Sequence, residues 1–275
     1  MIWIRLTDRL GNQMFQYATA LGVANRVGTQ VAVDVSSFVN RKAWRDYQLW
    51  RFSKLRLGRL PRQTVRTLFR PDGLKVLSPT GSGFCPELAL AGDDTLLRGF
   101  FQSERHFVDV RDEVVDLFDL RPFLKRKRIA AVHDRFGARS LVSIHVRRGD
   151  YVKVKLHNLG DMTAYYHRAA QIVLAAHADA AFVVFSDDPA WCRASPMLDG
   201  LDALVLDADA ALADMALMAS CQHHIIANST FSWWAAWLGQ NPDRMVMLPD
   251  RWFRGVDTRD IGITAMGWTE VATAA

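Results

Sequence analysis

Short apolar runs alternate with longer segments of helical periodicity along the chain, and this alternation restricts the fold more than any other feature. Residues 2–6 form a short, largely apolar run, residues 12–27 carry apolar side chains at helical spacing, and valines alternate with other residues over 31–35. A strand, a helix and a second strand in this order typically form a unit whose strands pair in parallel. The chain is therefore predicted to belong to the α/β class.

The same alternation returns in the second half of the chain. We expect strands at 141–146, 181–185, near Leu204, at 225–227 and at 245–248, with helices at 163–176, 210–220 and 231–238. A less regular region separates the halves, and we place the domain boundary close to Gly137. The prediction is an N-terminal Rossmann-like domain over 1–137 and a C-terminal one over 138–275.

The composition predicts a globular protein and disfavours membrane-spanning and disulfide-rich classes. The 275 residues are 50% hydrophobic, which is enough for a substantial core. No uncharged apolar run approaches the length of a spanning helix, and the first ten residues do not resemble a secretion signal, so we expect a cytoplasmic protein. The 3 cysteines are odd in number and widely spaced, so we expect reduced, buried thiols rather than disulfides.

The net charge of +5 favours anionic partners without choosing among them. Basic residues cluster in two segments, which are Arg51, Lys54, Arg56, Arg59, Arg62, Arg66 and Arg70, and then Lys125, Arg126, Lys127 and Arg128. Such clusters are usually solvated faces, and a peripheral contact with an anionic membrane is the alternative that stays open. We expect no nucleic-acid partner, and the sequence does not indicate an oligomeric state.

Chemistry is expected just after the predicted strands, because ligands of open parallel sheets bind beyond the carboxyl ends of the strands. Arg147 and Arg148 follow the 141–146 strand beside His145. Guanidinium groups stay charged and match phosphate oxygens in pairs, so two of them can hold a diphosphate and stabilise its charge as it leaves. The surface alternative is that these arginines form ordinary ion pairs.

Two further polar segments follow later strands. Asp187 and Asp188 come after the 181–185 strand, where Asp188 can cap a helix that begins at Pro189. The run Asn228, Ser229, Thr230 and Ser232 comes after the next buried strand, at the start of a helix, which is a natural place for an anion. Together with the arginines, these segments indicate a nucleoside diphosphate site, although Asp188 and Ser229 can also be helix caps only.

Other ligands fit the residues less well. Asp187 with Asp188, or Cys221, His223 and His224, resemble metal ligands only superficially, and the arginines already supply positive charge, so no metal is expected. Gly11 lies after the first predicted strand, as in dinucleotide-binding proteins. It stands alone where three spaced glycines are needed, which disfavours an NAD-dependent enzyme.

From Ile2 to about Pro249 the sequence resembles the bacterial and animal alpha-1,2-fucosyltransferases of glycosyltransferase family 11. The resemblance is carried by five ordered motifs: Leu10 to Ala18, Gly99 to Glu104 with Phe107, His145 to Tyr151, Phe185 to Asp188, and Asp214 through Cys221 to Trp234. The chain departs from the family pattern at Asp8 and Arg9, where relatives usually carry a glycine pair.

This resemblance implies a GT-B arrangement, in which two Rossmann-like domains face each other across a cleft. It implies an inverting, metal-independent transfer of fucose from GDP-fucose, bound by the C-terminal domain, to the 2-hydroxyl of a galactose-containing glycan on the N-terminal side. His145 and Asp187 would contact guanine or ribose, Arg147 and Arg148 the diphosphate. Further donor contacts would come from Asp188, Asn228, Ser229, Thr230 and Ser232.

The resemblance also implies roles for residues nearer the cleft, where Gly11, Asn12, Gln13 and Gln16 belong to the N-terminal motif. The acceptor hydroxyl needs a general base within hydrogen-bond reach. Asp150 is the first candidate, unless it only holds the arginines in place. The acceptor-side candidates are Asp8, Gln102 and Glu104. Another GDP-sugar as donor, or a non-catalytic nucleotide- or carbohydrate-binding protein of the same fold, remains the alternative.

Overall fold

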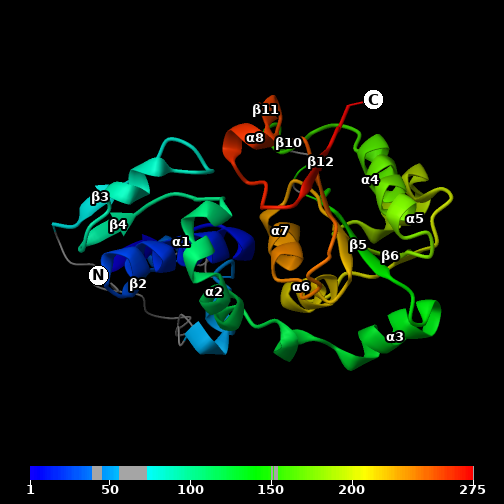
Figure 1. Cartoon of the computed structure of the whole chain (residues 1–275), viewed down its shortest axis with the longest axis horizontal. Coiled ribbons are helices and arrows are strands. Elements are labelled where there is room, and N and C mark those ends of the chain that lie inside the picture. The colour runs from blue at the N-terminus through cyan, green and yellow to red at the C-terminus, as the bar shows by residue number, and fades with distance from the viewer. Residues whose placement is uncertain (39–44, 56–72, 150, 152–153, 275) are drawn as a thin grey trace. The chain divides into compact units, whose positions relative to one another are not determined.

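The structure, a computed structural model, describes residues 1–38, 45–55, 73–149, 151 and 154–274. The chain divides into two compact units (Figure 1). Unit 1 is Met1–Asp119 with Ile261–Ile263, and unit 2 is Leu120–Asp260 with Thr264–Ala275. Each unit is built around its own parallel sheet, so the predicted α/β class with two Rossmann-like domains is confirmed.

Unit 1 contains a sheet in the order β2-β1-β4-β3, and all of its strand pairs are parallel. The strands are β1 (Ile2–Arg5), β2 (Val31–Asp34), β3 (Lys75–Leu77) and β4 (Thr95–Leu97). The short elements are η1 (Ser36–Phe38), η2 (Leu49–Arg51), η3 (Ser53–Leu55), η4 (Pro86–Leu90), η5 (Glu104–His106), η6 (Val108–Val110) and α2 (Arg111–Leu117). Strands β3 and β4, which have three residues each, were not predicted from the sequence.

The crossover between β1 and β2 is α1 (Leu10–Val27), close to the predicted helix. Its apolar side chains are buried, and it ends where Gly28 takes a left-handed φ of 74° and its N–H bonds to carbonyls of the last turn. Gly22 lets the helix approach η5 closely, since a Cβ there would lie 2.1 Å from the carbonyl oxygen of His106. This contact fixes the segment that follows β4 against the helix that follows β1.

Unit 2 contains a sheet in the order β12-β9-β8-β5-β6-β7, again parallel throughout. Its strands are β5 (Leu141–Val146), β6 (Ala181–Ser186), β7 (Ala203–Val205), β8 (His223–Ile225), β9 (Val246–Pro249) and β12 (Thr269–Val271). Numbered from β5 along the chain, the order is 3-2-1-4-5-6, the doubly wound order of dinucleotide-binding domains. The strand order reverses between β5 and β8. Ligands of such sheets bind beyond the carboxyl ends of the strands at this point, so we expect the ligand site there.

Helices cover both faces of this sheet. Figure 1 shows α4 (Thr163–Ala176) and α5 (Pro189–Ala194) on one side and α6 (Ala211–Ala219) and α7 (Thr230–Trp237) on the other. The remaining elements are η7 (Arg121–Phe123), α3 (Arg126–Phe136), η8 (Pro196–Leu198), the antiparallel pair β10 (Arg251–Phe253) and β11 (Val256–Asp257), and α8 (Thr258–Ile261). The predicted 163–176 helix and 141–146 strand have the bounds found in the structure.

Strand β8 begins two residues before the predicted strand, at two histidines that the apolar pattern had excluded. Both side chains are buried, but both have polar partners. His224 Nδ1 lies 2.8 Å from Ser143 Oγ, and His223 Nδ1 accepts the backbone N–H of Met245 at 3.0 Å. Cys85, Cys192 and Cys221 are free and buried, as predicted.

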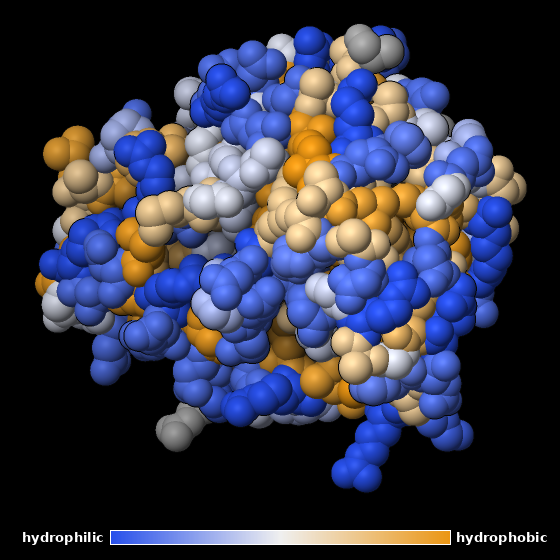
Figure 2. Space-filling model, turned by 45° about the vertical axis from the view of Figure 1, so that its right-hand side comes forward, coloured by the Kyte–Doolittle hydropathy of each residue, from blue (hydrophilic) through white to orange (hydrophobic). Residues whose placement is uncertain are grey.

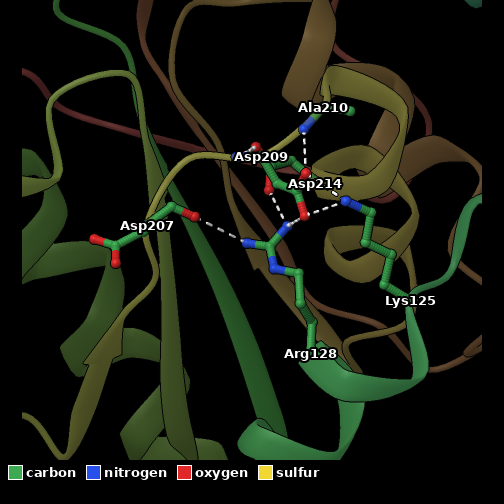
Figure 3. A network of polar contacts seen from close by, with 6 residues as sticks. All are labelled: Lys125, Arg128, Asp207, Asp209, Ala210 and Asp214. Carbon is green, nitrogen blue, oxygen red and sulfur yellow. Dashed lines mark hydrogen bonds and ion pairs between the residues drawn. The ribbon is translucent and has the colours of Figure 1, made fainter.

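The division of the chain falls before the predicted boundary at Gly137, because a network of ion pairs joins α3 to unit 2 (Figure 3). Lys125 Nζ lies 2.6 Å from Asp209, and Arg128 pairs with Asp214 and donates to the carbonyl oxygen of Asp207 at 3.2 Å. Asp214 Oδ2 also accepts the N–H of Asp209 at 3.2 Å. These contacts tie the start of α3 to the segment that leads into α6.

The same network bears on the proposed membrane contact. Lys125 and Arg128 form ion pairs with Asp209 and Asp214 of their own unit. Two of the four basic residues from Lys125 to Arg128 are therefore already paired within the protein. Most of the first cluster, from Arg56 to Arg70, lies outside the described residues. No helix in the described ranges is long and apolar enough to cross a membrane, and the face in Figure 2 mixes hydrophilic with hydrophobic residues.

The buried histidines predict how stability depends on pH, and burial lowers the pKa of each of the four that the structure describes. Burial lowers the pKa of His106 to about 4 and that of His145 and His224 to about 3. In the unfolded chain each imidazole binds a proton near pH 6.5, so the unfolded state binds more protons between these values and stability falls as the pH falls. We expect the free energy of unfolding to drop below pH 6.5 by up to about 1.4 kcal/mol per histidine and pH unit.

Urea unfolding at pH 7.5, 6.5 and 5.5 checks this expectation. The variant His106→Gln removes one of these titrating groups, and its loss of stability over this range should be smaller than that of the wild type. Equal stability of the wild type at pH 7.5 and 5.5 would contradict the burial of neutral histidines.

Candidate active site

The segments that the sequence singled out in unit 2 lie at the carboxyl ends of neighbouring strands. Arg147 follows β5, Asp187 follows β6, and Asn228 follows β8, with β5 between the other two strands. The register pairs Val146 with Ser186, so the next residues on the two strands are Arg147 and Asp187. The sheet therefore brings the arginine pair and the acidic pair together at the carboxyl ends of β5 and β6, next to the point between β5 and β8 where the strand order reverses.

Asp187 shapes the turn that carries the arginines. Its Oδ1 accepts the backbone N–H groups of Arg148 at 2.9 Å and Gly149 at 3.2 Å, while its Oδ2 pairs with the Arg147 guanidinium at 2.8 Å. A Cβ at Gly149 would lie 2.6 Å from the same Oδ2, so a side chain at this position would displace the Asp187 carboxylate. In this structure Asp187 holds the turn, whereas the sequence had suggested a contact with guanine or ribose.

Arg148 is held by a second set of contacts. Its guanidinium lies 3.9 Å from the centre of the Trp191 ring, and its Nε donates to Asp188 Oδ2 at 3.3 Å. The other oxygen of Asp188 accepts the N–H of Trp191 at 3.1 Å, which confirms the predicted cap of α5. Arg147 in turn lies 5.4 Å from the centre of the Tyr151 ring. Both guanidinium groups are thus oriented by an aromatic ring and a carboxylate.

A cavity of about 70 Å³ opens beside the arginines. Its polar and aromatic walls include Arg147, Arg148, Tyr151, His157, Asn158 and Trp191. The ring of His157 stacks on that of Tyr151 at 4.6 Å and meets that of Phe253 at 5.4 Å. The cavity therefore combines two positive charges with flat aromatic surfaces, which suits a charged ligand that carries planar or hydroxylated groups.

Asn228 also lines this cavity. It is buried, and its Nδ2 donates to the carbonyl oxygens of His157 at 3.1 Å and Trp252 at 3.0 Å. Ser232 is also buried, and its hydroxyl donates to the carbonyl oxygen of Ser229. Both side chains use their polar hydrogens within the protein, and their predicted contact with the donor stays a prediction.

Ser229 and Thr230 lie where β8 leads into α7. Ser229 is buried and precedes the helix, but its side chain makes no capping hydrogen bond, so the alternative of a simple cap is not found. Thr230 is half-buried and is the first residue of α7. The helix starts here with its N–H groups at the reversal edge of the sheet, an arrangement that favours an anion.

His145 is buried at the end of β5, with 6% of its surface exposed. Burial, and secondarily the positive charge of Arg147, lowers its pKa to about 3, so the imidazole is neutral at physiological pH. Its Nδ1 has no hydrogen-bond partner among the described residues. A buried ring nitrogen that lacks a partner at this edge is a group that a bound ligand can satisfy.

In unit 1, two glutamines of the N-terminal motif are structural rather than exposed to a cleft. Gln13 is fully buried, donates to the carbonyl oxygens of Asp8 and Asp46, and accepts the N–H groups of residues 48 and 49. Gln16 is fully buried and donates to Thr7 Oγ1 and to the carbonyl oxygen of residue 99. Gly11 is buried in the first turn of α1. The side chains of Gln13 and Gln16 form hydrogen bonds with buried backbone groups, which would otherwise lack partners.

Other candidates of unit 1 do come together. Asn12 donates to Asp8 Oδ2 at 2.6 Å and accepts from Gln102 Nε2 at 2.8 Å, so residues from two motifs form one polar chain. Glu104 begins η5 and is half-buried. Asp150, the first candidate for the general base, lies outside the described residues. No group of three histidine, cysteine or acidic side chains in the described ranges is placed to hold a metal ion.

The chain is similar to a known family and to several known proteins. The model of the family described as Glycosyl transferase family 11 matches residues 92–253. An alpha-1,2-colitosyltransferase of Escherichia coli is 26% identical over 97% of each chain, and the O-antigen biosynthesis glycosyltransferase WbnK of Escherichia coli is 27% identical over 91% of this chain and 94% of that protein. The galactoside alpha-(1,2)-fucosyltransferase 1 of Leontopithecus chrysomelas is 30% identical over 84% of this chain and 63% of that protein.

The family match covers more than half of the chain and includes all the segments that build the site of unit 2. The arginine turn, the acidic pair and the start of α7 all fall within it. The chain therefore belongs to glycosyltransferase family 11 and is a glycosyltransferase.

Proposed function

We propose that this enzyme transfers fucose from GDP-fucose to the 2-hydroxyl of a galactose-containing glycan, with inversion and without a metal ion. The observation that carries the reaction class is the pair of oriented guanidinium groups, Arg147 and Arg148, at the reversal edge of a doubly wound sheet. The sugar and the linkage are supported by relatives that are named alpha-1,2-fucosyl- and alpha-1,2-colitosyltransferases.

In this proposal the donor binds to unit 2. Arg147 and Arg148 contact the diphosphate, and the first N–H groups of α7 with the hydroxyls of Ser229 and Thr230 add hydrogen bonds. The neutral imidazole of His145 can both donate and accept a hydrogen bond, which fits the nucleoside end of the donor. Asp187 and Asp188 act through the arginines that they hold.

The proposed reaction is one displacement. The acceptor hydroxyl oxygen attacks the anomeric carbon opposite GDP, the bond from that carbon to the β-phosphate oxygen breaks, and the transition state resembles an oxocarbenium ion. Negative charge grows on the leaving phosphate, where an oriented positive group contributes about 3–4 kcal/mol. The hydroxyl proton passes to a carboxylate, for which Asp150, Glu104 and Asp8 are the candidates.

A second donor sugar has a specific observation in its favour. One relative, whose alignment covers 97% of each chain, is named an alpha-1,2-colitosyltransferase. Its name gives the same linkage with a different sugar. The arginine site binds the part of the donor that GDP-fucose and GDP-colitose share. The two donors must therefore be distinguished by experiment, and so must a protein that binds the nucleotide without turnover.

The function is tested by GDP release from GDP-fucose with a panel of β-galactosides in excess EDTA. We expect release that depends on the acceptor and survives EDTA. The variant Arg147→Ala should lower turnover by about 10²–10³-fold, because it removes a charge aimed at the leaving group. Arg193→Ala is the matched control, since Arg193 pairs with Asp207 on the surface of the same unit, and it should keep wild-type activity.

The other results would each change the proposal. Loss of release in EDTA would show a metal-dependent reaction. Release only from GDP-colitose would replace the sugar and keep the site. Binding of both donors without release on any acceptor would show a binding protein that retains the fold.

Gly149→Ala tests the turn itself. A Cβ at this position must displace Asp187, and a shift of about 1 Å in a positioning group can lower turnover by about 10²-fold. We expect lower turnover with an unchanged melting temperature. The control is Gly92→Ala, where nothing lies within 4 Å of the added Cβ. Wild-type turnover in Gly149→Ala would show that the close approach to Asp187 does not matter for the reaction.

A further inference from the structure

The cavity beside the arginines is also lined by apolar side chains, which are those of Val146, Leu159, Met162 and Tyr166. Val146 and Tyr166 are buried members of the hydrophobic core of unit 2, and Met162 packs against that core. The hydroxyl of Tyr166 already donates to the carbonyl oxygen of His145 at 3.0 Å, so its ring is the part left for a ligand. We call these four side chains the apolar wall of the cavity.

The acidic and amide side chains that line the same cavity already have partners within the protein. Asn158 Oδ1 accepts the N–H of Gly160 at 2.9 Å, and Asp161 Oδ1 accepts the N–H of Thr163 at 2.9 Å. Asn228 Nδ2 donates to two backbone carbonyl oxygens. A ligand in this cavity therefore meets two guanidinium groups, flat rings and an apolar wall.

The size of the cavity limits which part of a ligand it can hold. A water molecule needs about 10–15 Å³ of such volume, so a cavity of about 70 Å³ holds roughly five water-sized groups. That is too little for a purine base, but it suits one end of a sugar. In a hexose joined to phosphate through C1, only the ring oxygen separates C1 from C5, which carries C6. The C6 group is thus an end of the sugar that lies close to an arginine-bound phosphate.

We propose that the apolar wall receives the C6 methyl group of the donor sugar and so restricts the donors to 6-deoxy sugars. A methyl group gains free energy when it leaves water for an apolar surface. A hydroxyl group at C6 would lose its hydrogen bonds to water there without replacing them. Fucose lacks this hydroxyl, and so does colitose, the sugar in the name of one relative. This inference rests on the proposed function and names the class of sugar that its donor site accepts.

The test compares two donors that differ only at C6, GDP-L-fucose and GDP-L-galactose, which carries a hydroxyl there. We expect the wild type to prefer GDP-fucose by roughly 10²-fold in kcat/KM, since this is the discrimination that an apolar pocket reaches against an added hydroxyl. Met162→Gln places an amide on the apolar wall, and it should lower this preference by about tenfold or more. The affinity for GDP alone should stay the same, because GDP lacks the transferred sugar.

Three further variants make the test specific. Met162→Leu keeps the wall apolar and should keep the donor preference. Leu156→Gln makes a similar change nearby in the chain, but Leu156 is 52% exposed and does not line the cavity, so the preference should again be kept. Leu159→Gln changes the wall from a second position and should lower the preference as Met162→Gln does. Melting temperatures show which of the variants fold.

An unchanged donor preference in folded Met162→Gln or Leu159→Gln, or an equal loss in Leu156→Gln, would overturn the proposal. So would a wild type that uses both donors equally well. A fall in GDP affinity as large as the fall in donor use would show that the cavity holds part of the nucleotide instead. A wild type that releases GDP from neither donor with any acceptor would refute the proposed function, so the two failures are distinguishable.

Discussion

The geometry of the site in unit 2 depends on the interactions of one carboxylate, that of Asp187. It binds two backbone N–H groups of the turn after β5 and the guanidinium of Arg147, and these groups lie within reach because β5 and β6 pair in register up to Val146 and Ser186. Without this carboxylate, two adjacent arginines would stand on an open loop and repel each other. The pairing of β5 with β6 thus determines where the guanidinium groups of Arg147 and Arg148 lie.

Much of this arrangement was predictable from local patterns. The 141–146 strand, the 163–176 helix and the cap of α5 by Asp188 were all predicted and are confirmed, since each rests on residues close together in sequence. Strands β3, β4 and β12 were not predicted, because each has three residues and gains its stability from neighbours far away in the chain. The start of β8 was misplaced because its buried histidines look polar in sequence.

The direction of polar side chains was the harder part to predict. Asn228, Ser232, Gln13 and Gln16 lie in motifs that suggest ligand contacts, yet each bonds to the protein itself. The partner of Gln13 at Asp46 and the partner of Asn228 at Trp252 are distant in sequence, and no spacing rule indicates them. Asp8 and Gln102, both acceptor-side candidates, are joined through hydrogen bonds to Asn12 of the N-terminal motif, and their role toward the acceptor stays a prediction.

The central claim is that the turn held by Asp187 binds the diphosphate of the donor. Titration calorimetry with GDP and GMP, on the wild type and on Asp187→Ala, tests it most directly. The control is Asp202→Ala, which removes a carboxylate that pairs with Arg135 and Arg139 elsewhere in unit 2. The account predicts that the wild type and the control bind GDP at least roughly tenfold more tightly than GMP, and that Asp187→Ala loses this preference. An Asp187→Ala protein that still distinguishes GDP from GMP as the wild type does would contradict it.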